Sequence, residues 1–305
     1  MITSIMRKFV VALVLVCIAP ALHAAPIWTG AIDNNWSVAG NWVNNRPPLS
    51  SFDQAVIQAG TPIVAVFGTT VAHVRGVDVG GALHVNEGSR LTRCCQFPNG
   101  FLSNTSVVRS GGELRAQQSS IINIERLHRL SVNNGGSLIL RDQALLVNNA
   151  FWDGSANFNR MILRAGSRLN VMHSASLQNF GRLQNSGIMT FSSAASGANI
   201  GAGADLINSG TMHVQSSNGF NNGTRSDFVQ QGTLNINAGS QFVNEGGATF
   251  SHTGGTLNVT ANGTFDMQGG NVTLSGGTTN ISTGGRMLAG ANSLCLDGGT
   301  LNVSD

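Results

Sequence analysis

A short phrase recurs five times along the last third of this chain at a nearly constant spacing. Each copy opens with Gly-Thr and continues with alternating apolar and polar residues, and the copies begin at Gly210, Gly232, Gly255, Gly277 and Gly299. The steps between them are 22, 23, 22 and 22 residues. A repeat of this length is typical of a solenoid, in which each repeat packs against its neighbours in a stack.

The repeat that begins at Gly255 indicates what one coil contains. Three segments in it follow a glycine with apolar residues at alternating positions, the period of a half-buried β-strand. The residues expected to face inward are Leu257, Val259, Phe265, Met267, Val272 and Leu274. Because a coil of about 22 residues has no strand partner in its own plane, stacking in register must satisfy its backbone groups. We predict an all-β fold, a single-stranded parallel β-helix of about ten coils over 61–305.

Two departures from this regularity predict loops that leave the coil. The interval from Gly136 to Gly166 is 30 residues, and it includes the segment 148–154, which we expect to project from the rod. The small-residue run 197–204 is expected to be a flexible excursion.

The N-terminus predicts export. Arg7 and Lys8 precede an apolar run over 9–18, and residues 22–24 form a small-residue cleavage site, so 1–24 are typical of a signal peptide. The apolar run is too short to span a bilayer, and no other segment is long and apolar enough. The mature chain is expected to be secreted, periplasmic or at the outer cell surface, with no membrane span.

The start of the mature chain, 25–60, differs from the repeats. Trp28, Trp36 and Trp42 lie within 15 residues, close to a pair of prolines. Since the terminal repeat of a solenoid must cover an open apolar end, we interpret this segment as an N-terminal cap. The alternative is an aromatic platform on which sugar rings stack.

The other end of the sequence has no such segment. The last repeat stops at Asp305, and Leu301 and Val303 are patterned to face inward. An open final coil exposes unpaired backbone groups and an apolar cross-section. We therefore expect an uncapped C-terminal end that frays, associates end to end with another copy, or is covered by a C-terminal extension missing from this sequence.

A known family carries the same pattern. Trp-x-Gly, then Trp, then Asn-Trp, a proline and Asp-x-Ala-Val-Ile within 28–57, followed by Gly-Thr-Leu-x-Val repeats, resembles the passenger regions of bacterial autotransporters and related haemagglutinin-like secreted β-helix proteins. The resemblance spans nearly the whole mature chain and implies a right-handed parallel β-helix. Such proteins include adhesins, matrix components and some enzymes. This sequence lacks the membrane barrel that ends an autotransporter, so a truncated passenger fragment is a further interpretation.

Charge and cysteines add two expectations. Between 75 and 182 there are 12 Arg and six acidic residues, whereas from Asp205 onward there are two Arg and six acidic residues. We interpret this as solvated charge, with binding to acidic glycans or lipid head groups as the alternative. About nine coils at the strand spacing separate Cys295 from Cys94 and Cys95, so Cys295 is expected to be a free thiol. The state of the other two is left open.

One pair of carboxylates is a candidate for catalysis. Asp205 and Asp227 each precede a repeat glycine by five residues, so they should lie one above the other. Glycosidases and lyases need carboxylates that converge on one face, and the next coil offers only Thr249 there. We interpret the pair as solvated and predict no catalytic residues, no cofactor, no metal site and no nucleic-acid partner.

A second candidate is a row of asparagines. Asn235, Asn258, Asn280 and Asn302 lie between the two inward positions of successive coils, so they should form an outward ladder. Stacked amides hydrogen-bond along the axis and stabilise a solenoid. The alternative is that they face a ligand, presenting a regular polar surface to a glycan or a protein.

These features predict a secreted or cell-surface bacterial protein, adhesin-like or structural, without catalysis. Its partners would be glycans or proteins of a host or cell surface. The alternatives are a polysaccharide-acting β-helix enzyme (a lyase or glycosidase) and a passenger fragment.

Overall fold

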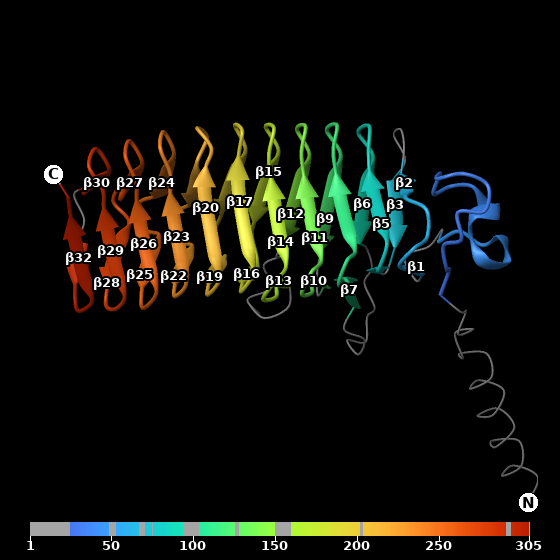
Figure 1. Cartoon of the computed structure of the whole chain (residues 1–305), viewed down its shortest axis with the longest axis horizontal. Helices are drawn as coiled ribbons and strands as arrows, with labels where there is room; N and C mark the ends of the chain where they lie inside the picture. Colours follow the sequence, from blue (N-terminus) through green and yellow to red (C-terminus); the bar gives the residue numbers. More distant parts are fainter. Residues whose placement is uncertain are drawn as a thin grey trace, which may run out of the picture.

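The computed structural model of the chain is a rod of stacked coils (Figure 1). It describes residues 25–48, 53–66, 71–74, 76–93, 104–125, 128–149, 160–201, 204–290 and 294–304. The predicted signal peptide, Cys94 and Cys95 lie outside these residues.

Each coil but the last contributes one strand to each of three parallel sheets, which contain 11, 11 and 10 strands within the described residues. Sheet 1 consists of β1 (Gln54–Ile57), β4 (Gly76–Val79), β7 (Asn104–Val108), β10 (His128–Val132), β13 (Arg160–Leu163), β16 (Arg182–Asn185), β19 (Asp205–Asn208), β22 (Asp227–Gln230), β25 (Thr249–His252), β28 (Asn271–Leu274) and β31 (Leu294–Leu296). Sheet 2 consists of β2 (Val64–Val66), β5 (Ala82–Val85), β8 (Glu113–Ala116), β11 (Ser137–Leu140), β14 (Arg168–Val171), β17 (Ile188–Ser192), β20 (Thr211–Gln215), β23 (Thr233–Ile236), β26 (Thr256–Val259), β29 (Thr278–Ile281) and β32 (Thr300–Val303). Sheet 3 consists of β3 (Val71–Val74), β6 (Arg90–Arg93), β9 (Ile121–Glu125), β12 (Leu145–Asn149), β15 (Ser176–Asn179), β18 (Ser196–Asn199), β21 (Phe220–Asn222), β24 (Gln241–Asn244), β27 (Thr264–Asp266) and β30 (Arg286–Leu288).

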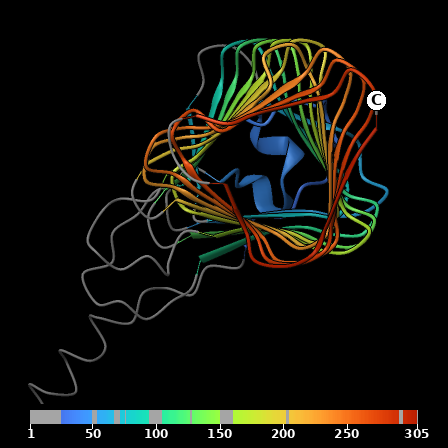
Figure 2. The ribbon, with the colours of Figure 1, turned by 90° about the vertical axis from the view of Figure 1, so that its left-hand side faces the viewer.

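Seen along its axis, the rod has a roughly triangular cross-section with one sheet on each side (Figure 2). This is the parallel β-helix that the repeat predicts. Helix is limited to two 3-10 turns in the described part of the chain, η1 (Ala39–Asn41) and η2 (Val43–Asn45).

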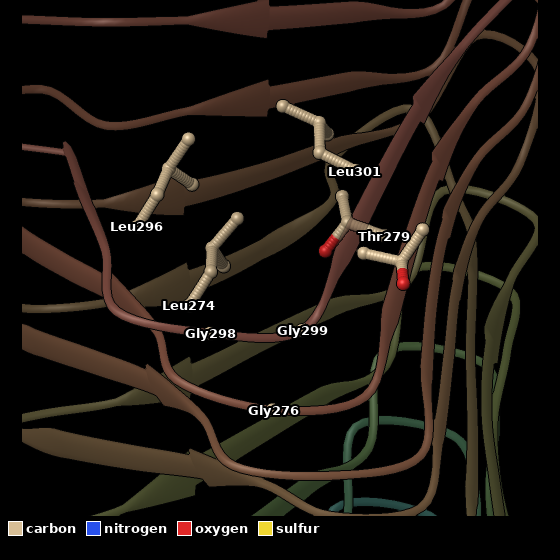
Figure 3. A pocket seen from close by; sticks show the side chains of 8 residues that line it. Leu274, Gly276, Thr279, Leu296, Gly298, Gly299 and Leu301 are labelled. Carbon is tan, nitrogen blue, oxygen red and sulfur yellow. The ribbon is translucent and has the colours of Figure 1, made fainter.

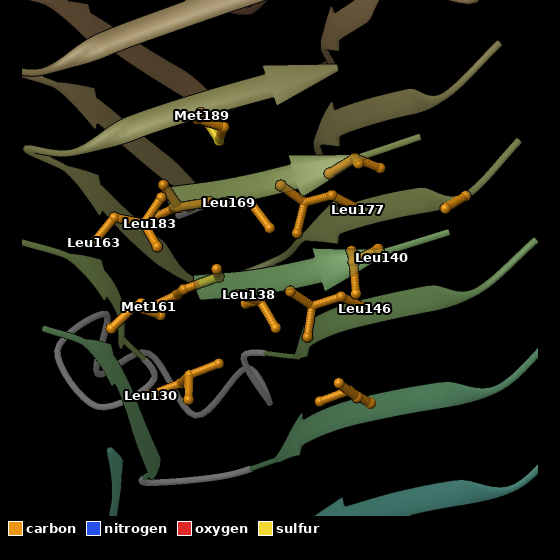
Figure 4. Close-up of a cluster of buried hydrophobic side chains, with 14 of the residues drawn as sticks. Leu130, Leu138, Leu140, Leu146, Met161, Leu163, Leu169, Leu177, Leu183 and Met189 are labelled. Atoms are coloured by element: carbon orange, nitrogen blue, oxygen red, sulfur yellow. The ribbon is translucent and has the colours of Figure 1, made fainter. Parts of the chain in front are cut away.

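The interior of the rod is filled by the inward residues of all three sheets (Figure 4). The six inward positions predicted for the coil at Gly255 are all at most 3% exposed. Like residues stack on like: Leu234 pairs with Leu257 on sheet 2, and Phe242 with Phe265 on sheet 3. The alternation of apolar and polar residues therefore sets which side of each strand is buried.

Aromatic rings form a continuous stack through the C-terminal half of this core. The ring centroids of Phe220 and Phe242 are 5.5 Å apart, and those of Phe242 and Phe265 are 5.2 Å apart with an interplanar angle of 4°. Gly197 occupies the inward position that precedes Phe220 on sheet 3. A Cβ atom there would lie 2.5 Å from Phe191 and from Phe220, so the absence of a side chain at Gly197 leaves room for both rings.

The repeat glycines are required by a close approach between coils. A Cβ atom on Gly232 would overlap the carbonyl oxygen of Gly210, and one on Gly255 would overlap that of Gly232. Gly255 also has φ +71°, a conformation that other residues rarely adopt. These corners stack backbone on backbone, so the glycine recurs once per coil.

The tryptophan segment packs across the N-terminal end of the rod, where Figures 1 and 2 show it in blue. Ile27 bridges to Val56, and the indole N–H of Trp28 donates to the carbonyl oxygen of Pro62 at 3.0 Å. The first strand of sheet 1, β1, lies within the range 25–60 predicted for the cap and already pairs with β4. The covering segment proper is therefore shorter than that range.

The first residues of both predicted excursions belong to strands. Asn148 and Asn149 end strand β12, and the rest of 148–154 lies outside the described residues. Gly197 to Asn199 belong to strand β18, which pairs with β15 and β21. Small residues there accommodate the neighbouring phenylalanines and do not mark a loop.

The last coil leaves inward-patterned side chains exposed. Leu296 is 57% exposed and Val303 is 65% exposed. Leu274, Leu296 and Leu301 surround a hollow of about 80 Å³ at this end of the core (Figure 3). End-to-end association through this coil stays a prediction. Cys295, on β31, is a free and exposed thiol, as the sequence predicts.

We expect Gly197→Val to destabilise the rod, because its added atoms would displace Phe191 and Phe220. Overpacking of this kind costs about 1–3 kcal/mol in the free energy of unfolding. The matched control is Ala198→Val, on the outward side of the same strand, which should be nearly neutral. Denaturant unfolding of both variants checks the expectation, and equal stabilities would contradict it.

Candidate functional site

The four asparagines expected on the outer surface form a hydrogen-bonded ladder on sheet 2. The Nδ2 atom of Asn258 donates to Oδ1 of Asn235 at 2.8 Å, and Asn280 and Asn302 each donate to the preceding amide at 2.9 Å. His213 occupies the preceding rung, with its Nδ1 atom 3.2 Å from Nδ2 of Asn235. Partial burial lowers the pKa of His213, which favours the neutral ring as the acceptor.

A column of threonines runs beside this ladder, two residues earlier in each strand. The threonines are in axial register from β20 to β32. We call the two columns together the Thr–Asn face; it consists of Thr211, Thr233, Thr256, Thr278 and Thr300 with His213, Asn235, Asn258, Asn280 and Asn302.

The three tryptophans do not form an exposed platform. Trp28, Trp36 and Trp42 are 1%, 3% and 2% exposed, and Trp42 makes edge-to-face contacts with the other two. The indole N–H of Trp42 donates to the backbone of Trp36 at 2.8 Å. Their ring faces are packed against protein, so stacking on a sugar ring is not available in this arrangement.

The two candidate carboxylates lie one above the other on the outer side of sheet 1. Asp205 on β19 pairs in register with Asp227 on β22, with Arg182 in the coil before and Thr249 in the coil after. The arginine continues a column, because Arg129, Arg160 and Arg182 are also in register. On the folded rod, the uneven charge along the sequence therefore places this column of arginines directly before the pair Asp205 and Asp227 on sheet 1.

The environment of Asp205 disfavours its charged form. Partial burial raises its pKa above the ordinary value of 3.8, and the negative charge of Asp227 raises it further, while Arg182 lowers it. Asp227 is exposed. The pair borders a hollow of about 270 Å³ that is lined by Arg182, Asp205, Ile207, Asp227, Phe228, Val229, Thr249 and Ser251.

Two further amide ladders lie inside the rod, and the sequence reasoning missed them. On sheet 3, Asn148, Asn179, Asn199, Asn222 and Asn244 are each fully buried, and every Nδ2 atom but the last donates to the next Oδ1 at 2.6–2.9 Å. On sheet 1, Asn185, Asn208 and Gln230 form a shorter ladder with bonds of 2.7 and 2.8 Å.

These buried amides also hold the corners of the coils. Nδ2 of Asn199 donates to the carbonyl oxygens of Ala204 at 3.1 Å and Asp227 at 3.0 Å. Nδ2 of Asn222 donates to the carbonyl oxygen of Thr249 at 3.0 Å. The sequence signal was an asparagine two positions after an inward residue, as in Leu177-Gln-Asn and Phe242-Val-Asn, repeated every 20 to 23 residues from Asn179 to Asn244.

Neither metal nor membrane features emerge from the described residues. They contain no group of three or more His, Cys, Asp or Glu side chains that could hold a metal ion. None of the helices among them is long and apolar enough to cross a membrane.

Comparison with known proteins gives little further guidance. No family model matches the chain, and no curated protein matches it. A solved structure similar to it is the crystal structure of a hyper-glycosylated TibA fragment whose glycosylation is catalysed by TibC. It is 15% identical, covers 92% of this chain and 97% of its own, and has a TM-score of 0.24. At that score the likeness carries no inference about this chain.

We expect the buried amide ladder on sheet 3 to contribute more to the free energy of unfolding than the outer ladder on sheet 2. Asn199→Leu would leave buried partner groups without a hydrogen bond, at a cost of about 1–3 kcal/mol for each. Asn258→Leu, the same change on the half-buried outer ladder, should cost about 0.5–1.5 kcal/mol because water replaces the lost bonds. Denaturant unfolding compares them, and an equal or larger loss for Asn258→Leu would contradict the assignment.

We also expect Asp205→Asn to raise thermal stability at neutral pH. The folded-state pKa of Asp205 is raised, so the folded protein is penalised at pH values above that pKa, where the carboxyl must be charged. The penalty disappears below the unfolded value of 3.8, because the carboxyl is then protonated in both states. Melting curves of the variant and the unmodified chain should therefore converge in acid; a variant that melts lower at pH 7 would contradict this.

Proposed function

We propose that this chain is an exported, adhesin-like structural module of the bacterial cell exterior that does not catalyse a reaction. The observation that carries the proposal is a rod with a filled interior whose outer surface repeats from coil to coil. The inward positions of all three sheets are buried and mostly apolar, so a partner would bind on the outside. A regular outer surface can hold an extended partner at several equivalent points, which multiplies weak contacts.

Further support comes from the sequence itself. The tryptophan pattern over 28–57 and the Gly-Thr-Leu-x-Val repeats resemble autotransporter passengers and haemagglutinin-like proteins, and residues 1–24 have the pattern of a signal peptide. On this proposal the mature chain acts in the periplasm or at the outer cell surface. Its partners would be glycans or surface proteins.

A polysaccharide-acting enzyme is the second candidate, and Asp205 and Asp227 are the observation that favours it. The pair is in register on adjacent strands, so the two Cα atoms are about 4.8 Å apart. Retaining glycosidases hold their two carboxyl groups about 5–5.5 Å apart, one with a raised pKa. However, the groups on either side of the pair are Arg182 and Thr249, and no further carboxylate follows on these strands.

Two measurements on the mature chain separate these functions. Beads coated with the protein should bind cells, or surfaces coated with glycans or extracellular proteins, more than beads coated with albumin do. Incubation with a panel of acidic and neutral polysaccharides should release no product.

The outcomes are decisive in both directions. Beads that bind none of the surfaces above the albumin level would refute the adhesin-like role. Product release that is lost in Asp205→Asn and in Asp227→Asn, but kept in Asp266→Asn on sheet 3, would establish the enzyme instead.

A further inference from the structure

The Thr–Asn face is uncharged over five consecutive coils. Its ten side chains are threonine, asparagine and one histidine whose pKa is lowered by burial. Earlier coils of sheet 2 carry Arg168 or Glu113 at the corresponding outward positions. In the same C-terminal coils, sheet 1 carries Asp227 and sheet 3 carries Asp266. The neutral and repetitive character therefore belongs to one face of one part of the rod.

The face is also rigid and evenly spaced. Backbone pairing sets its rungs about 4.8 Å apart along the axis, and its two columns are separated by two residues, about 6.7 Å along the strand. Each ladder bond uses one of the two N–H groups of an amide and one lone pair of the preceding amide. Asn258 and Asn280 thus keep one donor and one acceptor site each, in orientations that the ladder fixes.

These properties restrict the partner. A face without charge has no Coulomb attraction for an acidic glycan or a lipid head group, and one without Trp, Tyr or Phe lacks the large stacking surface that sugars use. What it offers is a regular array of hydroxyl, amide and methyl groups in strand register, with a spacing close to the repeat of the oxygen atoms in ice. Binding ordered water costs less when the protein groups are already fixed in position.

We propose that the Thr–Asn face binds ice. The threonine hydroxyls and the free amide groups hold water molecules at lattice positions, while the threonine methyl groups limit competing orientations of that water. Ice binding would be a further activity of the rod and does not depend on the adhesion proposed above.

The test is the effect of the full exported chain on single ice crystals. We expect a gap between the melting and freezing temperatures, and faceted crystals. Thr256→Lys should remove most of that gap, because a long charged side chain in the central rung interrupts the array of threonines and asparagines. Thr233→Lys, one coil earlier, should do the same.

The matched control is Thr264→Lys on β27. This residue lies in the same coil as Thr256, is also half-buried and faces outward, but belongs to sheet 3. It should keep the full effect on ice. Circular dichroism and melting curves confirm that all three variants are folded.

Four results would overturn the proposal. The unmodified chain could leave ice growth unchanged, or Thr264→Lys could reduce the effect as much as Thr256→Lys. Retention on insoluble cellulose or chitin that Thr256→Lys abolishes, without any effect on ice, would identify a neutral polysaccharide as the partner. A dimer in light scattering that Thr256→Lys dissociates, again without an effect on ice, would identify a second copy of the chain.

Discussion

Every part of this structure depends on hydrogen bonding between consecutive coils in strict register. A single coil cannot pair its own backbone groups, so its stability comes from the coil before and the coil after. The register is fixed because a slip of one residue would turn each buried side chain outward. Once Leu234 lies over Leu257, the neighbouring Asn235 must lie over Asn258. The core and the outer ladders are therefore two consequences of one constraint.

The corners of the coils need a solution of their own, because the chain must turn there without losing hydrogen bonds. Glycines such as Gly232 let backbones stack directly. Buried amides such as Asn199 and Asn222 bond to the next amide and also to carbonyl oxygens at the turns. Burial makes these bonds costly to lose, since water cannot replace them. The polar groups inside the rod are thus part of what aligns the coils.

The sequence predicted the coil and its inward residues because period-two alternation and a recurring glycine are strong local signals. It also predicted the positions of Asn235 and Asp205, since equal spacing from a repeat glycine implies equal height on the rod. It failed at Asn199 and Gly197, where a polar or missing side chain occupies an inward position. Local sequence patterns predict loops at such residues. Pairing with residues 20 or more positions away, such as Phe220, makes them part of a strand.

The tryptophans show a different limit of sequence reasoning. A cluster of Trp28, Trp36 and Trp42 predicts either a cap or an exposed platform, and only packing decides between them. The structure buries all three rings, so their chemistry is that of a core. Any binding by the surface of the rod must therefore involve the outward side chains of the sheets. Their regular spacing follows from the backbone register.

Cysteine cross-linking tests the register most directly, in a chain of residues 25–305 whose native Cys94, Cys95 and Cys295 are replaced by serine. Thr233 and Thr256 are in register, so their Cα atoms are about 4.8 Å apart, within disulfide reach. Thr233 and Asn258 are offset by two residues, about 8 Å apart, and too far to bridge. The account predicts that oxidation closes Thr233→Cys/Thr256→Cys and leaves Thr233→Cys/Asn258→Cys open. Equal closure of both pairs, or closure of the second alone, would contradict it.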